Sequence, residues 1–312
     1  MIFYTIFDDF DPQSALMIRD AGIELVIHPK GVPRPEKQRM TEILREYDGV
    51  IIGTSQKLSE DMFEAIDTPR IIGTASVGTD HIRIPEDKKQ LIWVLNAPTA
   101  SAYPVSEYVF AAVLSCCRRI GEGAGLYAEG RDNKSLSRKP EELSGKTIGV
   151  VGAGNIAEKI MEFAGFFGMR ILCWTRRPEQ HAHLAEKGTV FVSLERLAQE
   201  SDVIALALPS NAGTKGLISA GLASKMKDNA VFVSISRRET MDVEALIEKS
   251  RRNRNFYSCL DLDLDEEIRA AAKGLPNVVI TPHIAGGTRE NRIRMFREVT
   301  VRMLSMCQTM DA

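Results

Sequence analysis

Three polar side chains of complementary chemistry, Arg237, Glu266 and His283, each follow an apolar, β-branched run that is typical of a β-strand. In open α/β sheets, ligands bind beyond the carboxyl ends of the strands, where all three would lie. An arginine can bind and polarise a 2-keto acid. A histidine can exchange a proton with the carbonyl oxygen, and a glutamate bonded to that histidine can orient it. The set predicts hydride transfer to a 2-keto acid, with a nicotinamide cofactor supplying the hydride.

Each of these residues also has an ordinary structural explanation. His283 alone could be a core or capping histidine, and Glu266 lies in the acidic run 261–267, which could be a solvated loop. Arg237 and Arg238 could form a surface pair. The occurrence of all three together favours the catalytic interpretation.

A glycine-rich turn joins a predicted strand to a predicted helix in the stretch TIGVVGAGNIAEKI. Gly152 would allow the tight turn, Gly154 would let the backbone approach a pyrophosphate, and Ala157 is small enough for the helix to pack on the strand. The phosphates would lie against N–H groups near Asn155 and Ile156. Such a turn can be purely structural, but its place between strand and helix predicts a dinucleotide site.

The residues after the next predicted strand indicate which dinucleotide would bind. An Asp or Glu usually stands roughly 20 residues after the turn and holds the adenine ribose 2′-hydroxyl. Here that place holds Thr175, Arg176 and Arg177. An arginine can bind a 2′-phosphate through paired, charge-assisted hydrogen bonds, whereas a carboxylate would repel it. Two solvated arginines are the structural alternative. The sequence predicts NADP(H) as the preferred cofactor, with NAD as the second choice.

Short β-branched runs alternate with helical patterns, which predicts a doubly wound α/β protein with parallel sheets covered on both faces. A first series of predicted strands comprises 2–7, 24–28, 49–53, 70–74 and 91–95. A second series comprises 147–152, 170–174, 189–192, 202–208, 230–236, 257–262 and 277–281. A helix at 106–120 and a polar, glycine-rich segment at 121–145 separate the two series. The last predicted helix, 288–308, has no strand after it and must pack on an element formed earlier.

Composition narrows the class of protein. The chain has 312 residues, enough for two domains of about 100–200 residues each. Its net charge of −2 gives no general attraction to nucleic acid or membrane, and no apolar run approaches the ~20 residues of a membrane helix. The start of the chain lacks a basic leader, so we expect a cytoplasmic protein. No cysteine spacing indicates a metal site, and we expect buried, reduced thiols at positions 116, 117, 173, 259 and 307.

Over nearly its whole length the chain resembles the D-isomer-specific 2-hydroxyacid dehydrogenase family. The segments that carry the resemblance are ASVGTDHI (75–82), NAPTASAYPVSEYVFAAVL (96–114), ELSGKTIGVVGAGNIA (142–157), LALPSNAGTKGLI (206–218), SISRRETMDVEAL (234–246), LDLDLDEE (260–267) and LPNVVITPHIAGGT (275–288). Their ordered occurrence is far more specific than any one motif.

The resemblance implies a role for particular residues. Arg237 would bind the substrate, and Glu266 and His283 would form the catalytic pair. The substrate carboxylate would be held by backbone amides around Ser76, Val77 and Gly78. On the cofactor side, the implied contacts are Asp261 at the nicotinamide carboxamide, and Leu208, Pro209 and Thr214 beside the adenosine.

The resemblance also implies the organisation of the chain. A flavodoxin-like substrate domain would comprise 1–98 and 288–312, and a Rossmann cofactor domain 99–287, with the active site in the cleft between them. Family members are typically dimers formed through the cofactor domains, which the helix at 106–120 and the loop after it would suit. The implied function is an NADPH-preferring reductase of glyoxylate or hydroxypyruvate, acting as a homodimer.

The chain departs from the family pattern near the predicted site. Arg238 and Glu239 stand where two glycines are usual, Ser76 where glycine is common, and Glu267 where proline is usual. The charged pair could change the preferred size or charge of the substrate. Arg238 could bind a phosphate, which keeps a phosphoglycerate-type dehydrogenase as an alternative. A non-enzymatic, nucleotide-sensing protein of the corepressor type is the other alternative.

Overall fold

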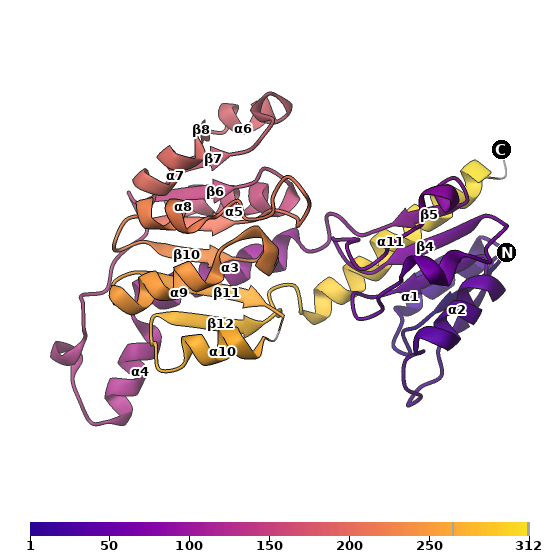
Figure 1. Cartoon of the computed structure of the whole chain (residues 1–312), viewed down its shortest axis with the longest axis horizontal. Helices are drawn as coiled ribbons and strands as arrows, with labels where there is room; N and C mark the ends of the chain where they lie inside the picture. The colour runs from indigo at the N-terminus through magenta and orange to yellow at the C-terminus, as the bar shows by residue number, and fades with distance from the viewer. Residues whose placement is uncertain (264, 311–312) are drawn as a thin grey trace. The chain divides into compact units, whose positions relative to one another are not determined.

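A computed structural model describes residues 1–263 and 265–310, which form two compact units (Figure 1). The first unit comprises Met1–Ser101 together with the C-terminal segment from Thr288, and the second comprises Ala102–Gly287. The first segment thus ends at Ser101 rather than at the predicted residue 98, and the C-terminal segment starts at the predicted residue 288. None of the helices in the described ranges combines the length and apolar character that crossing a membrane requires.

The first unit is a parallel five-stranded sheet covered by helices. Its strands are β1 (Ile2–Thr5), β2 (Glu24–Ile27), β3 (Gly49–Ile52), β4 (Arg70–Thr74) and β5 (Ile92–Leu95). Its helices are α1 (Pro12–Asp20), α2 (Lys37–Glu46) and α11 (Arg289–Met310), with short 3₁₀ helices at Glu60–Phe63 and Glu86–Lys88. The strand order β2-β1-β3-β4-β5 is that of flavodoxin-like folds, as the resemblance implies.

Helix α11 belongs to the first unit although the whole second unit separates it in sequence. Its side chains Phe296, Val299 and Met303 are almost fully buried in the core of the five-stranded sheet. Gly73 in β4 permits this approach, because a Cβ atom there would collide with the sulfur of Met303. Each such buried apolar side chain contributes about 1.5–3 kcal/mol. The prediction that this helix packs on an element formed earlier is confirmed.

The second unit is a parallel seven-stranded sheet. Its strands are β6 (Thr147–Val151), β7 (Arg170–Trp174), β8 (Val190–Phe191), β9 (Val203–Leu206), β10 (Val231–Ser234), β11 (Tyr257–Leu262) and β12 (Val278–Pro282). The order β12-β11-β10-β9-β6-β7-β8 contains the Rossmann arrangement, with β12 added at one edge (Figure 1). The predicted strand at 189–192 is only two residues long, because β8 pairs with β7 over two positions at the other edge.

Helices cover both faces of this sheet (Figure 1). They are α3 (Ala102–Cys117), α4 (Ile120–Ala128), α5 (Asn155–Phe166), α6 (Ala182–Glu186), α7 (Leu194–Glu200), α8 (Ala220–Lys225), α9 (Val243–Arg252) and α10 (Glu266–Ala272). Short 3₁₀ helices lie at Asn133–Ser135, Pro178–His181 and Arg238–Thr240. The polar, glycine-rich segment at 121–145 thus contains most of a regular helix, α4.

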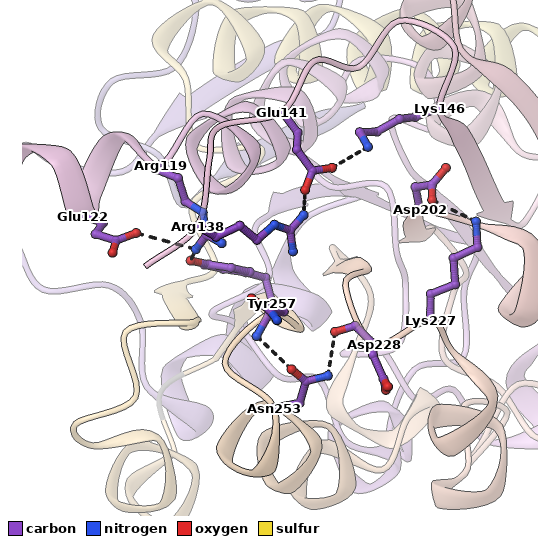
Figure 2. Close-up of polar contacts among 11 residues, drawn as sticks. Arg119, Glu122, Arg138, Glu141, Lys146, Asp202, Lys227, Asp228, Asn253 and Tyr257 are labelled. Carbon is purple, nitrogen blue, oxygen red and sulfur yellow. Dashed lines mark hydrogen bonds and ion pairs between the residues drawn. The ribbon is translucent and has the colours of Figure 1, made fainter. Parts of the chain in front are cut away.

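A cluster of charged and polar side chains fastens the segment after α3 to the amino ends of the strands (Figure 2). Arg119 adopts a left-handed backbone conformation with φ of 58° and is nearly fully buried. Its guanidinium is bonded to the hydroxyl of Tyr257, at the start of β11, and lies 3.7 Å from the carboxylate of Glu122. Glu141 binds both Arg138 and Lys146, so it links this segment to the residue before β6.

Asp202 makes a second connection at the same end of the sheet (Figure 2). Its carboxylate accepts the N–H of Thr147 at 2.9 Å and lies 2.8 Å from the ammonium nitrogen of Lys227. Burial would raise the pKa of Asp202, but these two partners hold it below its usual value. Since this end is opposite to the carboxyl ends of the strands, the cluster is structural rather than part of the predicted site.

Candidate active site

The predicted site residues of the second unit gather at the carboxyl ends of its parallel strands. The residues directly beyond strand ends are Gly152 after β6, Thr175 after β7, Asp263 after β11 and His283 after β12. Two further positions lie slightly beyond their strands, Leu208 after β9 and Arg237 after β10. Parallel strands end at one edge of the sheet, which is where α/β enzymes bind ligands.

His283 contacts a cation on one side and a carboxylate on the other. Its Nε2 lies 3.3 Å from Nη1 of Arg237, and its Nδ1 lies 2.9 Å from Oδ1 of Asp263. A guanidinium can only donate, so Nε2 accepts and the ring proton lies on Nδ1, which donates to Asp263. Arg237 and His283 are therefore brought together as the sequence predicts, with an unforeseen carboxylate behind the histidine.

Asp261 holds the turn that carries His283. Its Oδ1 accepts the hydroxyl of Thr281 at 2.6 Å and the N–H of Ile284 at 2.8 Å, and its Oδ2 accepts the N–H of Ala285 at 2.8 Å. The side chain is buried, with 3% of the residue exposed. His283 has φ of 51°, a left-handed conformation that needs such support in a residue other than glycine. We did not predict this positioning role from the sequence. A polar aspartate and a polar threonine at the ends of two apolar strands could have indicated a hydrogen bond between the strands at this place.

Helix α3 extends the same network. The hydroxyl of Thr281 gives its one proton to Asp261, so it accepts the proton of the Tyr108 hydroxyl, 2.6 Å away. Burial raises the pKa of Tyr108 to about 12. Tyr108 thus stays a neutral donor, and the turn of His283 is connected through two hydroxyl groups to α3.

Glu266 and His283, which the sequence predicts to be bonded, have different partners in this structure. Glu266 is the first residue of α10, and its carboxylate accepts from Nε of Arg269 at 2.8 Å. The physical reason is the helix start: Asp265 accepts the N–H of Ile268 at 3.1 Å, which lowers the pKa of Asp265 and begins α10 at residue 266. A residue at that position reaches the residue three further on. A catalytic role of Glu266 stays a prediction.

The unusual pair after Arg237 makes contacts within the second unit. The guanidinium of Arg238 is bonded to Asp265 and to Glu244, the latter at 2.7 Å. Burial tends to lower the pKa of Arg238, but these two carboxylates raise it above its usual value. Glu239 is exposed, and its carbonyl group accepts the N–H of Gly216 at 2.8 Å.

The glycine-rich turn has the shape that a dinucleotide requires. Gly152 has φ of 122°, and a Cβ atom there would lie 2.5 Å from the carbonyl oxygen of Ala207, so only glycine fits. A Cβ atom on Gly154 would meet nothing within 4 Å, which leaves open space at the N-terminus of α5. Ala157 is fully buried. These residues fit a bound pyrophosphate, which would use the space beside Gly154 and the amides of Asn155 and Ile156.

The arginines after β7 line a pocket. Thr175, Arg176 and Arg177 share it with Gln180 and His181. A Cβ atom on Gly213 would collide with the guanidinium of Arg176, so this arginine lies directly on the loop after β9. The residues fit an anionic group on the adenosine side of a dinucleotide.

The loop after β9 is shaped by its own polar side chains. Leu208 donates its N–H to the hydroxyl of Ser236 at 3.0 Å. Thr214 donates its hydroxyl to the carbonyl oxygen of Pro209 at 2.7 Å and accepts the N–H of Asn211 at 2.9 Å. Because Thr214 is only 1% exposed, it shapes the loop rather than presenting a surface to a ligand.

In the first unit, the segment of Ser76, Val77 and Gly78 follows β4. The hydroxyl of Ser76 donates to the carbonyl oxygen of Gly78 at 2.7 Å, and Nδ2 of Asn96 donates to that of Val77 at 2.6 Å. These bonds fix both carbonyl groups of the loop. The serine that replaces the usual glycine therefore supplies a bond that glycine could not make.

Comparisons with known proteins agree with the fold. The profile of a family described as "D-isomer specific 2-hydroxyacid dehydrogenase, NAD binding domain" matches residues 110–285. The chain is 34% identical over 270 residues to the hydroxypyruvate reductase of Thermotoga maritima, covering 85% of this chain and 86% of the relative. It is 30% identical over 305 residues to the glyoxylate reductase of Pyrococcus furiosus, covering 94% and 89%.

A solved structure supports the same assignment. The D-lactate dehydrogenase of Aquifex aeolicus, complexed with NAD and lactic acid, superposes with a TM-score of 0.77 at 27% identity, covering 99% of this chain and 96% of that one. The resemblance expected from the sequence is confirmed. The chain belongs to the D-isomer specific 2-hydroxyacid dehydrogenase family, and it is an oxidoreductase of 2-hydroxy acids that uses a nicotinamide cofactor.

Proposed function

We propose that the protein reduces a small 2-keto acid of the glyoxylate or hydroxypyruvate type, with NADPH preferred over NADH. The names of the two relatives at 34% and 30% identity support the substrate class. The observation that carries the cofactor preference is the pair Arg176 and Arg177, which lines a pocket at the carboxyl end of β7. An acidic residue in that place would instead favour the 2′-hydroxyl of NAD.

The proposed roles follow from the contacts of each residue. Arg237 binds and polarises the keto group, and the amides of the loop 76–78 hold the substrate carboxylate. The substrate takes the place that Arg237 has at Nε2 of His283. This nitrogen first takes up a proton from solvent, so that the ring carries a proton on both nitrogens, and then donates it to the substrate oxygen while Nδ1 keeps its own. A bound nicotinamide supplies the hydride. Asp261 keeps the histidine turn in place, and Glu266 is retained as a second carboxylate of the catalytic machinery.

The cofactor would lie along the turn and the loops beside it. Gly152 and Gly154 accommodate the pyrophosphate, with Asn155 and Ile156 at the start of α5. Leu208 and Pro209 line the adenosine side, while Thr214 holds their loop in shape. Thr175 to Arg177 bind the 2′-phosphate. Asp261 would contact the nicotinamide carboxamide while keeping its bonds to the histidine turn.

The phosphoglycerate alternative loses its main argument. That alternative depends on Arg238 binding a substrate phosphate. Arg238 is instead bonded to Asp265 and Glu244, which already neutralise its charge. The corepressor alternative is decided by the assay below.

The test is an assay with a panel of 2-keto acids and both cofactors. We expect glyoxylate or hydroxypyruvate to be reduced with a higher kcat/KM than pyruvate. The double change Arg176→Ala and Arg177→Ala should raise the KM for NADPH about tenfold or more, equivalent to about 1.4 kcal/mol. The KM for NADH should change less than about twofold, because NADH lacks the 2′-phosphate.

The matched control is Lys187→Ala, which removes an exposed cation of the same unit outside the pocket. It should change neither KM value. Equal effects of the double change on both cofactors would contradict the NADPH preference. Absence of turnover with every keto acid and both cofactors would contradict the reductase and favour a nucleotide-sensing protein.

We also propose a homodimer formed through the second unit. Helix α4 is almost entirely apolar in sequence, yet Ile120 is 59% and Tyr127 is 86% exposed. Large exposed apolar side chains on one helix are typical of a protein–protein contact. Sedimentation equilibrium should give twice the chain mass of 34.6 kDa, and Tyr127→Glu should shift it toward the monomer.

A reducing compartment such as the cytoplasm fits the cysteine chemistry. The sulfur atoms of Cys116 and Cys259 lie 3.4 Å apart without a disulfide, and Cys173 is fully buried. Burial raises the pKa of Cys173 to about 12, so it stays a thiol.

A further inference from the structure

The carboxylate behind His283 is not the one that the family pattern supplies. We propose that Asp263 is the positioning residue of His283: it accepts the Nδ1 proton and thereby presents Nε2 to the substrate. The proposal rests on the proposed function only in taking His283 as the proton donor. The bond itself is 2.9 Å long, between Nδ1 and Oδ1.

The register of the sheet places the two residues together. Strands β11 and β12 are parallel neighbours, and their last paired residues are Leu262 and Pro282. Asp263 and His283 are the next residues on the two strands. Their juxtaposition therefore follows from the pairing of two adjacent strands and needs no loop to fold back. Glu266 lies three positions further along, inside helix α10.

Three other acidic residues near Asp263 in the sequence bind partners other than the imidazole. Asp261 accepts two backbone N–H groups of the histidine turn. Asp265 accepts the N–H groups that start α10 and binds Arg238. Glu266 binds Arg269. Of these four acidic residues, Asp263 alone is recorded in contact with the imidazole.

The contacts with Arg237 and Asp263 together determine which ring nitrogen of His283 carries the proton. Because the guanidinium donates to Nε2, the neutral ring carries its proton on Nδ1, where Asp263 receives it. A carboxylate has only acceptor oxygens, so it excludes the tautomer in which Nδ1 accepts. Nε2 is thereby kept as the nitrogen that exchanges a proton with the substrate oxygen.

Asp263 and His283 are exposed enough for a substitution at Asp263 to affect the position of the imidazole without affecting the fold. The Asp263 side chain is 83% exposed and that of His283 is 37% exposed. Exposed ion pairs of this kind contribute little to stability. Replacing Asp263 should therefore change the orientation and tautomer of His283 while leaving the fold intact, which makes the proposal testable by substitution.

The test compares Asp263→Asn and Asp263→Ala with Glu266→Gln, in the full-length protein with its cofactor. Glu267→Gln is the matched control, because it removes an exposed negative charge from the same run. Steady-state kcat and keto-acid KM are measured for each variant. The tautomer of His283 is read in alkaline buffer from two-bond ¹H–¹⁵N couplings, with His283→Gln used to assign the signal.

We expect both changes at Asp263 to lower kcat about tenfold or more, with a change in KM below about threefold. The ¹⁵N spectrum should show loss of the pure Nδ1–H tautomer in Asp263→Asn, since an amide can also donate to Nδ1 and the contact of Arg237 with Nε2, at 3.3 Å, is too long to fix the tautomer alone. Glu267→Gln should change neither quantity. The melting temperature of every variant should stay close to that of the wild type.

Three outcomes would overturn the proposal. The first is wild-type kcat and tautomer in Asp263→Asn. The second is a lower kcat with an unchanged tautomer. The third is a change of tautomer in Glu266→Gln but not in Asp263→Asn, which would return the role to Glu266. If the wild type reduces no keto acid, the proposed function fails, whereas the ¹⁵N spectra still decide whether Asp263 holds His283.

Discussion

The guanidinium of Arg238 is bonded to the carboxylate of Asp265, which also accepts the N–H of Ile268 at 3.1 Å and so caps helix α10. This connection ties the loop after β10 to the loop after β11. Arg237 lies in the first loop and Asp263 in the second, and both contact His283. The arginine that replaces a glycine of the family pattern thus links the two loops whose side chains contact His283.

Arg238→Gly should lower kcat several-fold, because the two loops lose their link while Arg237, Asp263 and His283 remain. The free energy of unfolding should fall by less than about 1 kcal/mol, since the side chains of this pair are partly exposed. Chemical denaturation and steady-state kinetics measure the two effects. Glu244→Gln removes the other partner of Arg238 and should leave kcat near the wild-type value. Equal kcat in wild type and Arg238→Gly would contradict the link.

Asp261→Asn should lower kcat on the order of 100-fold and the free energy of unfolding by about 1–3 kcal/mol. Asparagine has one acceptor oxygen, so its NH₂ group would face a backbone N–H of the histidine turn. Thr281→Val is the control, because it removes one hydroxyl contact and keeps both amide bonds to Asp261. It should retain most of the activity. An Asp261→Asn variant with wild-type kcat would show that the turn does not depend on this carboxylate.

Gly154→Ala and Gly152→Ala should separate cofactor binding from folding. A Cβ atom on Gly154 meets open space, so the variant should fold with a stability within about 0.5 kcal/mol of the wild type. The methyl group would occupy the place of the pyrophosphate, and the KM for either cofactor should rise about tenfold or more. Gly152→Ala should instead lose about 1–3 kcal/mol of stability, because of its positive φ. Unaltered cofactor binding in Gly154→Ala would place the pyrophosphate elsewhere.

Protonation of Asp202 should make the protein less stable in acid. Its folded-state pKa is lowered, so its contribution is present above its unfolded pKa of about 4 and is lost as the pH falls through the folded value. At neutral pH, the free energy of unfolding of Asp202→Asn should be about 1–3 kcal/mol lower than that of the wild type. The difference should shrink below about pH 4, as measured by denaturation at a series of pH values.

The control for this pH dependence is Asp228→Asn, whose carboxylate is 88% exposed and 3.6 Å from Lys249. Its stability should stay close to that of the wild type throughout. A difference between Asp202→Asn and the wild type that stays constant down to pH 2 would contradict the expected titration.

The arrangement of strands, the glycine-rich turn and the strand-end residues could all be predicted from the sequence. Apolar β-branched runs identify buried parallel strands, and a residue that follows one must lie at the sheet edge. Arg237 and His283 were located in this way. The limits of α4 and β8 could not be predicted, because a glycine-rich apolar helix and a two-residue edge strand have weak patterns.

The partner of His283 escaped prediction for a different reason. The family pattern points to Glu266, but the helix cap at Asp265 and the reach of Arg269 depend on three-dimensional contacts. Strand register would have favoured Asp263, yet register is known only once β11 and β12 are paired. The same holds for Arg238, whose two carboxylate partners are Glu244 in α9 and Asp265, the residue that caps α10.

His283 lies at the end of β12, the outermost strand on its side of the seven-stranded sheet. A strand at a sheet edge has only one neighbour, so it separates in partial opening reactions before the central strands do. Its separation would break the bonds from Asp261 to the histidine turn and the contact with Asp263 in one event. The activity of the protein is therefore expected to depend on whether β12 remains paired with β11. During unfolding, activity should be lost before the seven-stranded sheet unfolds as a whole.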